Sequence, residues 1–166
     1  MSKVNSSQGF TLIEVVTSIV IIMILAAVAV PSMAPMIESM QLSMVVNSMK
    51  HELICAKTRA LEDSRIHCGV HFDTASTPQR LQAFLDVGKP EHDGVYTEGS
   101  DQIFGAAYVL PPTIRFTIGG TGDNSDIIYR GDGSTKIHGM IITVKTGRGK
   151  TRFLTVLPST GRTKIY

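Results

Sequence analysis

Tryptophan is absent from this sequence, cysteine occurs only twice, and both aromatic and charged side chains are scarce. Aromatic residues make up 6% of the chain and charged residues 18%, whereas 43% of the positions are hydrophobic. Two cysteines exclude a disulfide-framework miniprotein, and the apolar content excludes an intrinsically disordered chain. With 166 residues, the chain has room for one ordinary domain.

Acidic residues are absent between Gly133 and Tyr166, a segment that holds seven Lys or Arg. Positions 1–132 therefore hold nine basic against fourteen acidic residues and are net negative. This asymmetry is typical of a contact surface for an anionic partner or a complementary subunit. A sheet edge that cations protect from aggregation gives the same pattern.

Glycine, proline and all but one charge are missing from the 21 residues Phe10–Val30. At about 1.5 Å per helical residue this run spans roughly 31 Å, close to the roughly 30 Å hydrocarbon core of a bilayer. Because the chain has one such run, a polytopic membrane protein is excluded. A secretory signal has a shorter apolar core that precedes its cleavage site. Here the small residue Gly9 precedes the run, so cleavage there would remove only the polar residues 1–9.

Glu14 is the one charge in this run, and an isolated carboxylate there costs about 2.5–3.5 kcal/mol on insertion scales. One compensation is a capping box, because Thr11 and Glu14 have the spacing with which the Glu side chain returns to first-turn N–H groups. The other is assembly, in which Glu14 pairs with the new α-ammonium of Phe10 on a neighbouring chain after cleavage.

Residues 9–15, Gly-Phe-Thr-Leu-Ile-Glu-Val, resemble the prepilin signature of type IV pilins and type II secretion pseudopilins. The resemblance implies that a prepilin peptidase cleaves between Gly9 and Phe10 and methylates the new amino group. It also implies that Glu14 neutralises the Phe10 amine of a neighbouring pilin in a helical filament. Before assembly, the implied location is the bacterial inner membrane, with a single pass, a cytoplasmic N-terminus and a periplasmic C-terminal domain.

A single helix is expected from Phe10 to about Glu62, bent by Pro31, where the family commonly has a helix-kinking proline, and by Pro35. Its second half has the three-and-four spacing of one buried apolar face. That face is Leu42, Val45, Val46, Met49, Leu53, Ala56 and Ala60. The expected parts are a leader, 1–9, a transmembrane or filament-core helix, 10–30, an amphipathic half, 31–62, and a globular domain, 63–166.

Beyond Ser64 the hydrophobic period changes from that of a helix to that of strands. The expected strands are 65–72, 80–87, 113–118, 126–129, 137–145, 150–157 and 162–166, with turns at 146–149 and 158–161. The segment 88–112 is expected to be a long surface connection. The fold class is therefore α+β, a pilin-like arrangement of a long N-terminal helix packed on an antiparallel β-sheet.

The C-terminal residues 160–166, Thr-Gly-Arg-Thr-Lys-Ile-Tyr, with the strands before them, resemble the ending of the GspH/FimT group of minor pilins and pseudopilins, and the helix end 53–60 fits the same group. The resemblance implies a low-abundance subunit near the filament tip that helps to initiate assembly. It also implies an alternative function, DNA uptake, because FimT-type members are associated with DNA capture through Gly-Arg-x-Arg. Lys164 replaces the last Arg and keeps its charge but not its two-pronged contact. The candidate DNA-binding residues are Arg162, Lys164, Arg148, Lys150 and Arg152.

The two cysteines suggest either a metal site or a disulfide. His51, Cys55, Cys68 and His71 have the spacings of a Cys₂His₂ zinc site. Strand alternation argues against zinc, because Cys68 and His71 lie on opposite faces of the expected strand. A Cys55–Cys68 disulfide suits an extracytoplasmic domain, although Cys55 lies off the helix face that meets Cys68. Two reduced structural thiols are the alternative.

No residue set predicts catalysis. The five histidines are scattered singly, and the Gly-rich residues 119–122 lack the Lys-Ser/Thr ending of a phosphate-binding loop. Asp123, Asn124 and Asp126 could be weak calcium ligands, but no twelve-residue loop with a terminal Glu follows. The chain is therefore expected to be a structural or interaction protein without metal or cofactor, and not an enzyme.

Overall fold

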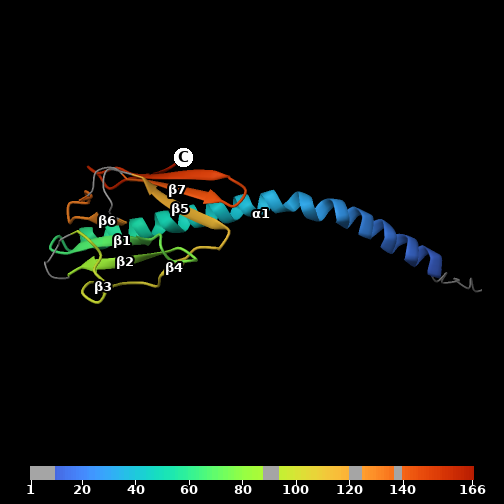
Figure 1. The fold of residues 1–166 in the computed structure, drawn as a ribbon, viewed down its shortest axis with the longest axis horizontal. Coiled ribbons are helices and arrows are strands. Elements are labelled where there is room, and N and C mark those ends of the chain that lie inside the picture. Colours follow the sequence, from blue (N-terminus) through green and yellow to red (C-terminus); the bar gives the residue numbers. More distant parts are fainter. Residues whose placement is uncertain (1–9, 88–93, 120–124, 137–139) are drawn as a thin grey trace, which may run out of the picture. The chain divides into compact units, whose positions relative to one another are not determined.

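The computed structural model describes residues 10–87, 94–119, 125–136 and 140–166. The expected leader, including Gly9, and the candidate calcium ligands Asp123 and Asn124 lie outside the described residues. The chain divides into two compact units, residues 1–38 and 39–166. The first unit holds the beginning of the helix α1, and the second holds the rest of α1 and all the described strands (Figure 1).

Helix α1 runs from Leu12 to Glu62 and includes both Pro31 and Pro35. It begins two residues later than expected because Thr11 caps it: the Thr11 Oγ1 accepts a hydrogen bond from the N–H of Glu14 at 3.3 Å. The predicted apolar face is confirmed, since the buried residues of α1 are Leu42, Val45, Val46, Met49, Leu53, Ala56 and Ala60. After the helix, the Asp63 carboxylate accepts the N–H of Arg65 and closes a turn.

One antiparallel sheet, sheet A, is built on β1 (His67–Asp73) and β2 (Arg80–Asp86). Its strand order is β3-β2-β1-β6, and β4 also pairs with β2. The added strands are β3 (Gln102–Ile103), β4 (Tyr108–Val109) and β6 (Asp126–Tyr129). The expectation of a plain connection over 88–112 is therefore wrong in part, because β3 and β4 extend the edge of the sheet.

A second antiparallel sheet, sheet B, has the order β5-β7-β8-β9. Its strands are β5 (Ile114–Gly119), β7 (Met140–Thr146), β8 (Thr151–Val156) and β9 (Thr163–Ile165). The first residues of the strand expected at 137–145 lie outside the described residues. The strands thus form two sheets where one was expected. The chain leaves sheet A to form β5 of sheet B, returns to sheet A as β6, and then forms β7, β8 and β9 of sheet B.

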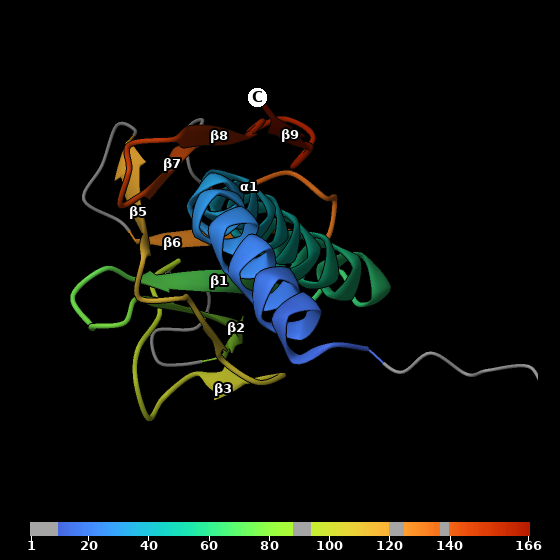
Figure 2. The same cartoon turned by 90° about the vertical axis from the view of Figure 1, so that its right-hand side faces the viewer.

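The second half of α1 packs between the two sheets, as Figure 2 shows within the unit 39–166. Met49 and Leu53 of the helix are fully buried, as are Phe72 of β1 and Ile142 of β7. The rings of Phe72 and Phe116 meet edge to face, with their centroids 5.6 Å apart, and so join β1 to β5. Helix and sheets therefore share one apolar core.

Candidate functional site

The N-terminal end of α1 presents an aromatic residue and a carboxylate to its surroundings. Phe10 is 84% exposed, and Glu14 lies in the first turn of the helix. Among the described residues, no hydrogen bond or ion pair reaches the Glu14 carboxylate. Of the predicted capping box, the bond from the Glu14 N–H to the Thr11 hydroxyl is therefore present. The described residues show no bond from a first-turn N–H to the Glu14 carboxylate.

Two hydroxyl groups in the apolar run are satisfied by the helix itself. Thr17 donates to the Ile13 carbonyl at 2.9 Å, and Ser18 donates to the Glu14 carbonyl at 2.7 Å. A hydroxyl that bonds to the carbonyl one turn earlier leaves no donor without a partner. Neither side chain therefore opposes an apolar environment around this segment.

The apolar run of α1 is uncovered. Each large apolar side chain between Leu12 and Val30 is exposed by 45% or more. The most apolar window of α1 has a mean hydropathy of 2.8 with 0% of it buried, so α1 is long and apolar enough to cross a membrane. An exposed apolar surface of this size requires a cover of lipid or protein.

Two of the candidate DNA-binding residues lie at the β8–β9 end of sheet B. Lys164 stands opposite Thr155 in the register, and its Nζ lies 5.6 Å from the centre of the Tyr166 ring. Arg162 immediately precedes β9, and its carbonyl accepts the N–H of Leu157 at 2.9 Å. Both basic side chains are exposed.

The other three candidates lie at the opposite end of β8. Arg152 stands opposite the buried Val144, so it lies on the side of β8 that faces α1. Arg148 and Lys150 belong to the β7–β8 hairpin, and the Lys150 Nζ donates a hydrogen bond to the Ser39 hydroxyl. The five candidates therefore do not share one face of the sheet.

The turn before β9 is packed against the body of the domain at Gly161. This residue has φ +58°, and a Cβ there would lie 2.4 Å from the Gly133 carbonyl oxygen and 2.8 Å from the Tyr129 ring. From the helix, Lys57 Nζ donates to the Thr160 carbonyl at 2.7 Å. Burial raises the pKa of Tyr129 to about 12, so the ring below the turn stays uncharged. These contacts position the C-terminal strand and its basic residues.

Both cysteines are free thiols in the structure. Cys55 is half-buried, with its Sγ 3.5 Å from His51 Nε2, whereas Cys68 lies in the core, where burial raises its pKa to about 11. As expected from strand alternation, Cys68 and His71 lie on opposite faces of β1: Cys68 packs under α1, while His71 meets Asp126. No group of three or more metal-ligating side chains occurs among the described residues.

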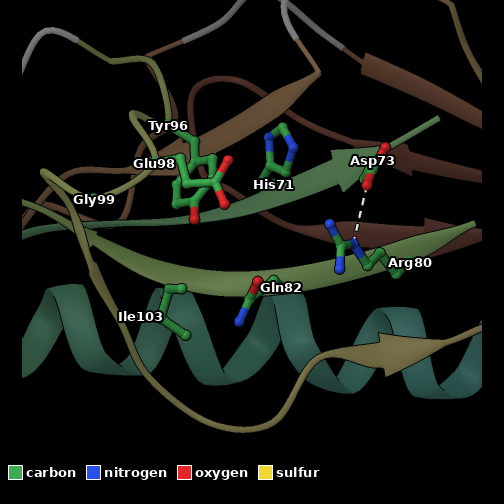
Figure 3. Close-up of a pocket in the computed structure, with 8 residues that line it drawn as sticks. All are labelled: His71, Asp73, Arg80, Gln82, Tyr96, Glu98, Gly99 and Ile103. Carbon is green, nitrogen blue, oxygen red and sulfur yellow. Dashed lines mark hydrogen bonds and ion pairs between the residues drawn. The ribbon is translucent and has the colours of Figure 1, made fainter. Parts of the chain in front are cut away.

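A cavity of about 310 Å³ lies on the face of sheet A that points away from α1. It is lined by His71, Asp73, Arg80, Gln82, Tyr96, Glu98, Gly99 and Ile103 (Figure 3). His71 Nδ1 lies 2.6 Å from Oδ1 of the buried Asp126, and the other oxygen of Asp126 accepts the N–H of Tyr96 at 2.7 Å. The His71 and Tyr96 rings also stack, with centroids 4.6 Å apart.

A histidine held by a buried carboxylate can act as a general base, but nucleophilic catalysis also needs a nucleophile beside it. Among the described residues that line this cavity, none is Ser, Thr or Cys. The contacts of Asp126 instead attach Tyr96 and the segment after it to sheet A. Of the three residues weighed as weak calcium ligands, Asp126 is the one that the structure describes, and its two oxygens contact His71 and the Tyr96 N–H.

Sequence reasoning missed the His71–Asp126 pair. The two residues are 55 positions apart, and they meet only because β1 and β6 pair with His71 opposite Asp126. Nothing in the local pattern around either residue indicates this register. The one available signal was that an acidic residue, Asp126, begins an otherwise apolar strand.

Asp73 makes the stability of this region sensitive to acid. Its carboxylate accepts bonds from the Ser76 hydroxyl and N–H, the Ala75 N–H and the Arg80 guanidinium; the Ser76 hydroxyl has the largest effect in lowering its pKa to about 2. A lowered pKa stabilises the fold at pH values above the ordinary pKa of 3.8, and this stabilisation is lost as the pH falls towards about 2.

The full chain in detergent is therefore expected to be more stable than the Asp73→Asn variant at pH 6, as measured by guanidinium titration. The difference in unfolding free energy between the two proteins should shrink as the pH falls from about 4 to about 2. A difference that stays constant over this range would contradict the lowered pKa of Asp73.

Comparison with known proteins agrees with this geometry. Residues 4–30 match the family described as the prokaryotic N-terminal methylation motif. No curated protein matches the chain. Among solved structures, the chain is similar to the minor pseudopilin EpsH from the Type 2 Secretion System of Vibrio cholerae. The TM-score is 0.55 and the identity 11%, over 76% of this chain and 96% of that chain. The predicted resemblance and fold class are confirmed: residues 4–30 carry the prokaryotic N-terminal methylation motif, and the chain has a pilin-like α+β fold similar to that of a minor pseudopilin.

Proposed function

We propose that the chain is a minor pilin or pseudopilin, a structural subunit of a type IV pilus or a type II secretion pseudopilus. The observation that carries the proposal is the contrast within α1. Its first half is apolar and exposed and carries the methylation motif, whereas its second half is buried in the domain. Lipid covers the first half while the subunit is stored, and the first halves of neighbouring subunits cover one another in the filament.

Processing and storage follow from the same motif. A prepilin peptidase cleaves after Gly9 and methylates the Phe10 amine, and α1 then anchors the chain in the bacterial inner membrane by a single pass. The N-terminus is cytoplasmic and the globular domain periplasmic. In the filament, the Glu14 carboxylate of one subunit pairs with the Phe10 amine of the next and sets their register.

As in the GspH/FimT group, we place the subunit near the filament tip. DNA binding stays a prediction for Arg162 and Lys164. The structure does not favour a single surface for all five basic candidates, because Arg148, Lys150 and Arg152 lie at the other end of β8.

The intact mass of the protein purified from its native membrane tests the proposal. The mass is expected to correspond to a chain that begins at Phe10 and carries one added methyl group. A Gly9→Leu variant is the matched control, because it should keep residues 1–9 and remain membrane-bound. A wild-type mass that begins at Met1 or Ser2 would mean that the chain is an ordinary anchored protein and not a processed pilin.

A further inference from the structure

Basic residues surround the β7–β8 hairpin, which lies beside Ser39 within the unit 39–166. Lys150 donates to the hydroxyl of Ser39, the first residue of the unit 39–166. Arg152 lines a cavity of about 160 Å³ with Ser43 and Asn47, about one to two helical turns further along α1. Arg152 therefore faces α1, and we call the remaining basic residues around the hairpin the hairpin cluster: Arg115, Lys145, Arg148 and Lys150.

Two members of the hairpin cluster are paired unfavourably within the sheet. Arg115 of β5 and Lys145 of β7 stand directly opposite each other, and both are exposed. Like charges at directly opposed positions destabilise an antiparallel pair. Among the described residues, no hydrogen bond or ion pair joins either side chain to an acid. Within the described chain no acid offsets this repulsion, and a bound anion would relieve it.

The two cations line a small cavity at the surface. A cavity of about 180 Å³ is lined by Arg115, Lys145, Thr113 and Gly147, together with two further residues. It opens at the surface next to the hairpin, and both cations on its wall are exposed. The segment from Gly133 to Tyr166 holds no acidic residue, whereas Glu38 of α1 immediately precedes Ser39.

Only a short stretch of helix separates the apolar run from Ser39, the residue that Lys150 contacts. Only residues 31–38 separate Val30 from Ser39, and α1 is helical throughout, so this stretch is about 14 Å long. The headgroup layer extends roughly 5–7 Å beyond the hydrocarbon core on each side. Ser39 can therefore rise at most about 9 Å above the headgroups, which is within reach of long basic side chains and near the Debye length of about 8 Å.

We propose that the hairpin cluster binds anionic phospholipid headgroups of the bilayer that α1 spans. The contact holds the globular unit at the membrane surface while the subunit is stored, and extraction into the filament breaks it. The inference rests on the proposed function, because it requires the first half of α1 to lie in a bilayer. Attraction of this kind falls off within a Debye length and weakens with salt.

Energy transfer from a single Trp to a dansyl-labelled lipid headgroup tests the inference on the full chain in nanodiscs. The chain has no Trp, and Thr151 is exposed opposite Lys145, so Thr151→Trp reports on the hairpin alone. Transfer is expected to be higher in phosphatidylglycerol-containing discs than in pure phosphatidylcholine discs. Adding Arg115→Gln and Lys145→Gln should shift the docked-to-undocked ratio about thirtyfold towards undocked.

Arg162→Gln with Lys164→Gln is the matched control, because it removes two charges at the other end of β8 and should leave the transfer unchanged. Equal transfer in neutral and anionic discs, or an equal loss in the control, would overturn the inference. It would also be overturned if Arg115→Gln and Lys145→Gln weakened DNA binding without changing the transfer. Resistance to alkaline carbonate extraction checks insertion separately: an extracted chain contradicts the proposed function itself, and an inserted chain with unchanged transfer contradicts only the lipid contact.

Discussion

Replacing Gly161 by Ala is expected to lower the free energy of unfolding by about 3–5 kcal/mol, a large effect for one methyl group. Two causes act together. The residue has φ +58°, a conformation that costs a side-chain-bearing residue about 1–3 kcal/mol. The added Cβ would also lie 2.4 Å from the Gly133 carbonyl oxygen, which is backbone and cannot rotate away. The turn must therefore separate from the body of the domain.

Gly149→Ala is the control that isolates the first cause. Gly149 has φ +88°, but no atom lies within 4 Å of its added Cβ. Its cost should therefore be the conformational one alone, about 1–3 kcal/mol. Guanidinium denaturation followed by circular dichroism measures both variants. Equal losses for the two variants would show that the close approach to Gly133 and Tyr129 does not contribute.

The displaced turn should also move the C-terminal strand. In the wild type, Gly161 and the Lys57–Thr160 contact hold the start of β9 against the domain. In Gly161→Ala, amide hydrogen exchange is therefore expected to rise first at Leu157, whose N–H bonds to the Arg162 carbonyl. Rapid exchange confined to another strand would contradict this order of opening.

Replacing Glu14 by Val is expected to abolish incorporation into filaments while membrane insertion is kept. Removing a carboxylate from the apolar run favours insertion by about 2.5–3.5 kcal/mol. In the proposed filament, the same change would leave the Phe10 ammonium of a neighbour buried without a partner, at a cost of about 3–5 kcal/mol. Incorporation should therefore fall by more than about a hundredfold. Carbonate-resistant membrane protein and protein in sheared filaments, both quantified by immunoblot, give the two readouts.

Thr17→Val is the matched control for this experiment. Thr17 lies one turn after Glu14, and the substitution also makes the segment more apolar. It removes no charge, and the hydroxyl that is lost bonds only to carbonyls of the same helix. It should be inserted and incorporated normally. If Glu14→Val reached filaments at the level of Thr17→Val, the pairing with the Phe10 amine would not set the register.

The structure of α1 could be predicted from local patterns. The three-and-four spacing identified every buried residue between Leu42 and Ala60, because a helix places residues of that spacing on one face. The cap at Thr11 was also visible, since it depends on residues three positions apart. The apolar run needed only its length and composition to indicate a membrane or filament core.

Tertiary structure alone decided how distant segments meet. The short strands β3 and β4, which follow weak patterns, form because the edge of β2 offers them unpaired backbone groups. The His71–Asp126 pair and the opposition of Arg115 and Lys145 depend on strand registers that no local spacing encodes. For the same reason the sequence showed a basic C-terminal segment but not its division between the two ends of β8. A side chain's neighbours across a sheet are set by pairing between segments, and pairing is decided only when the whole core forms.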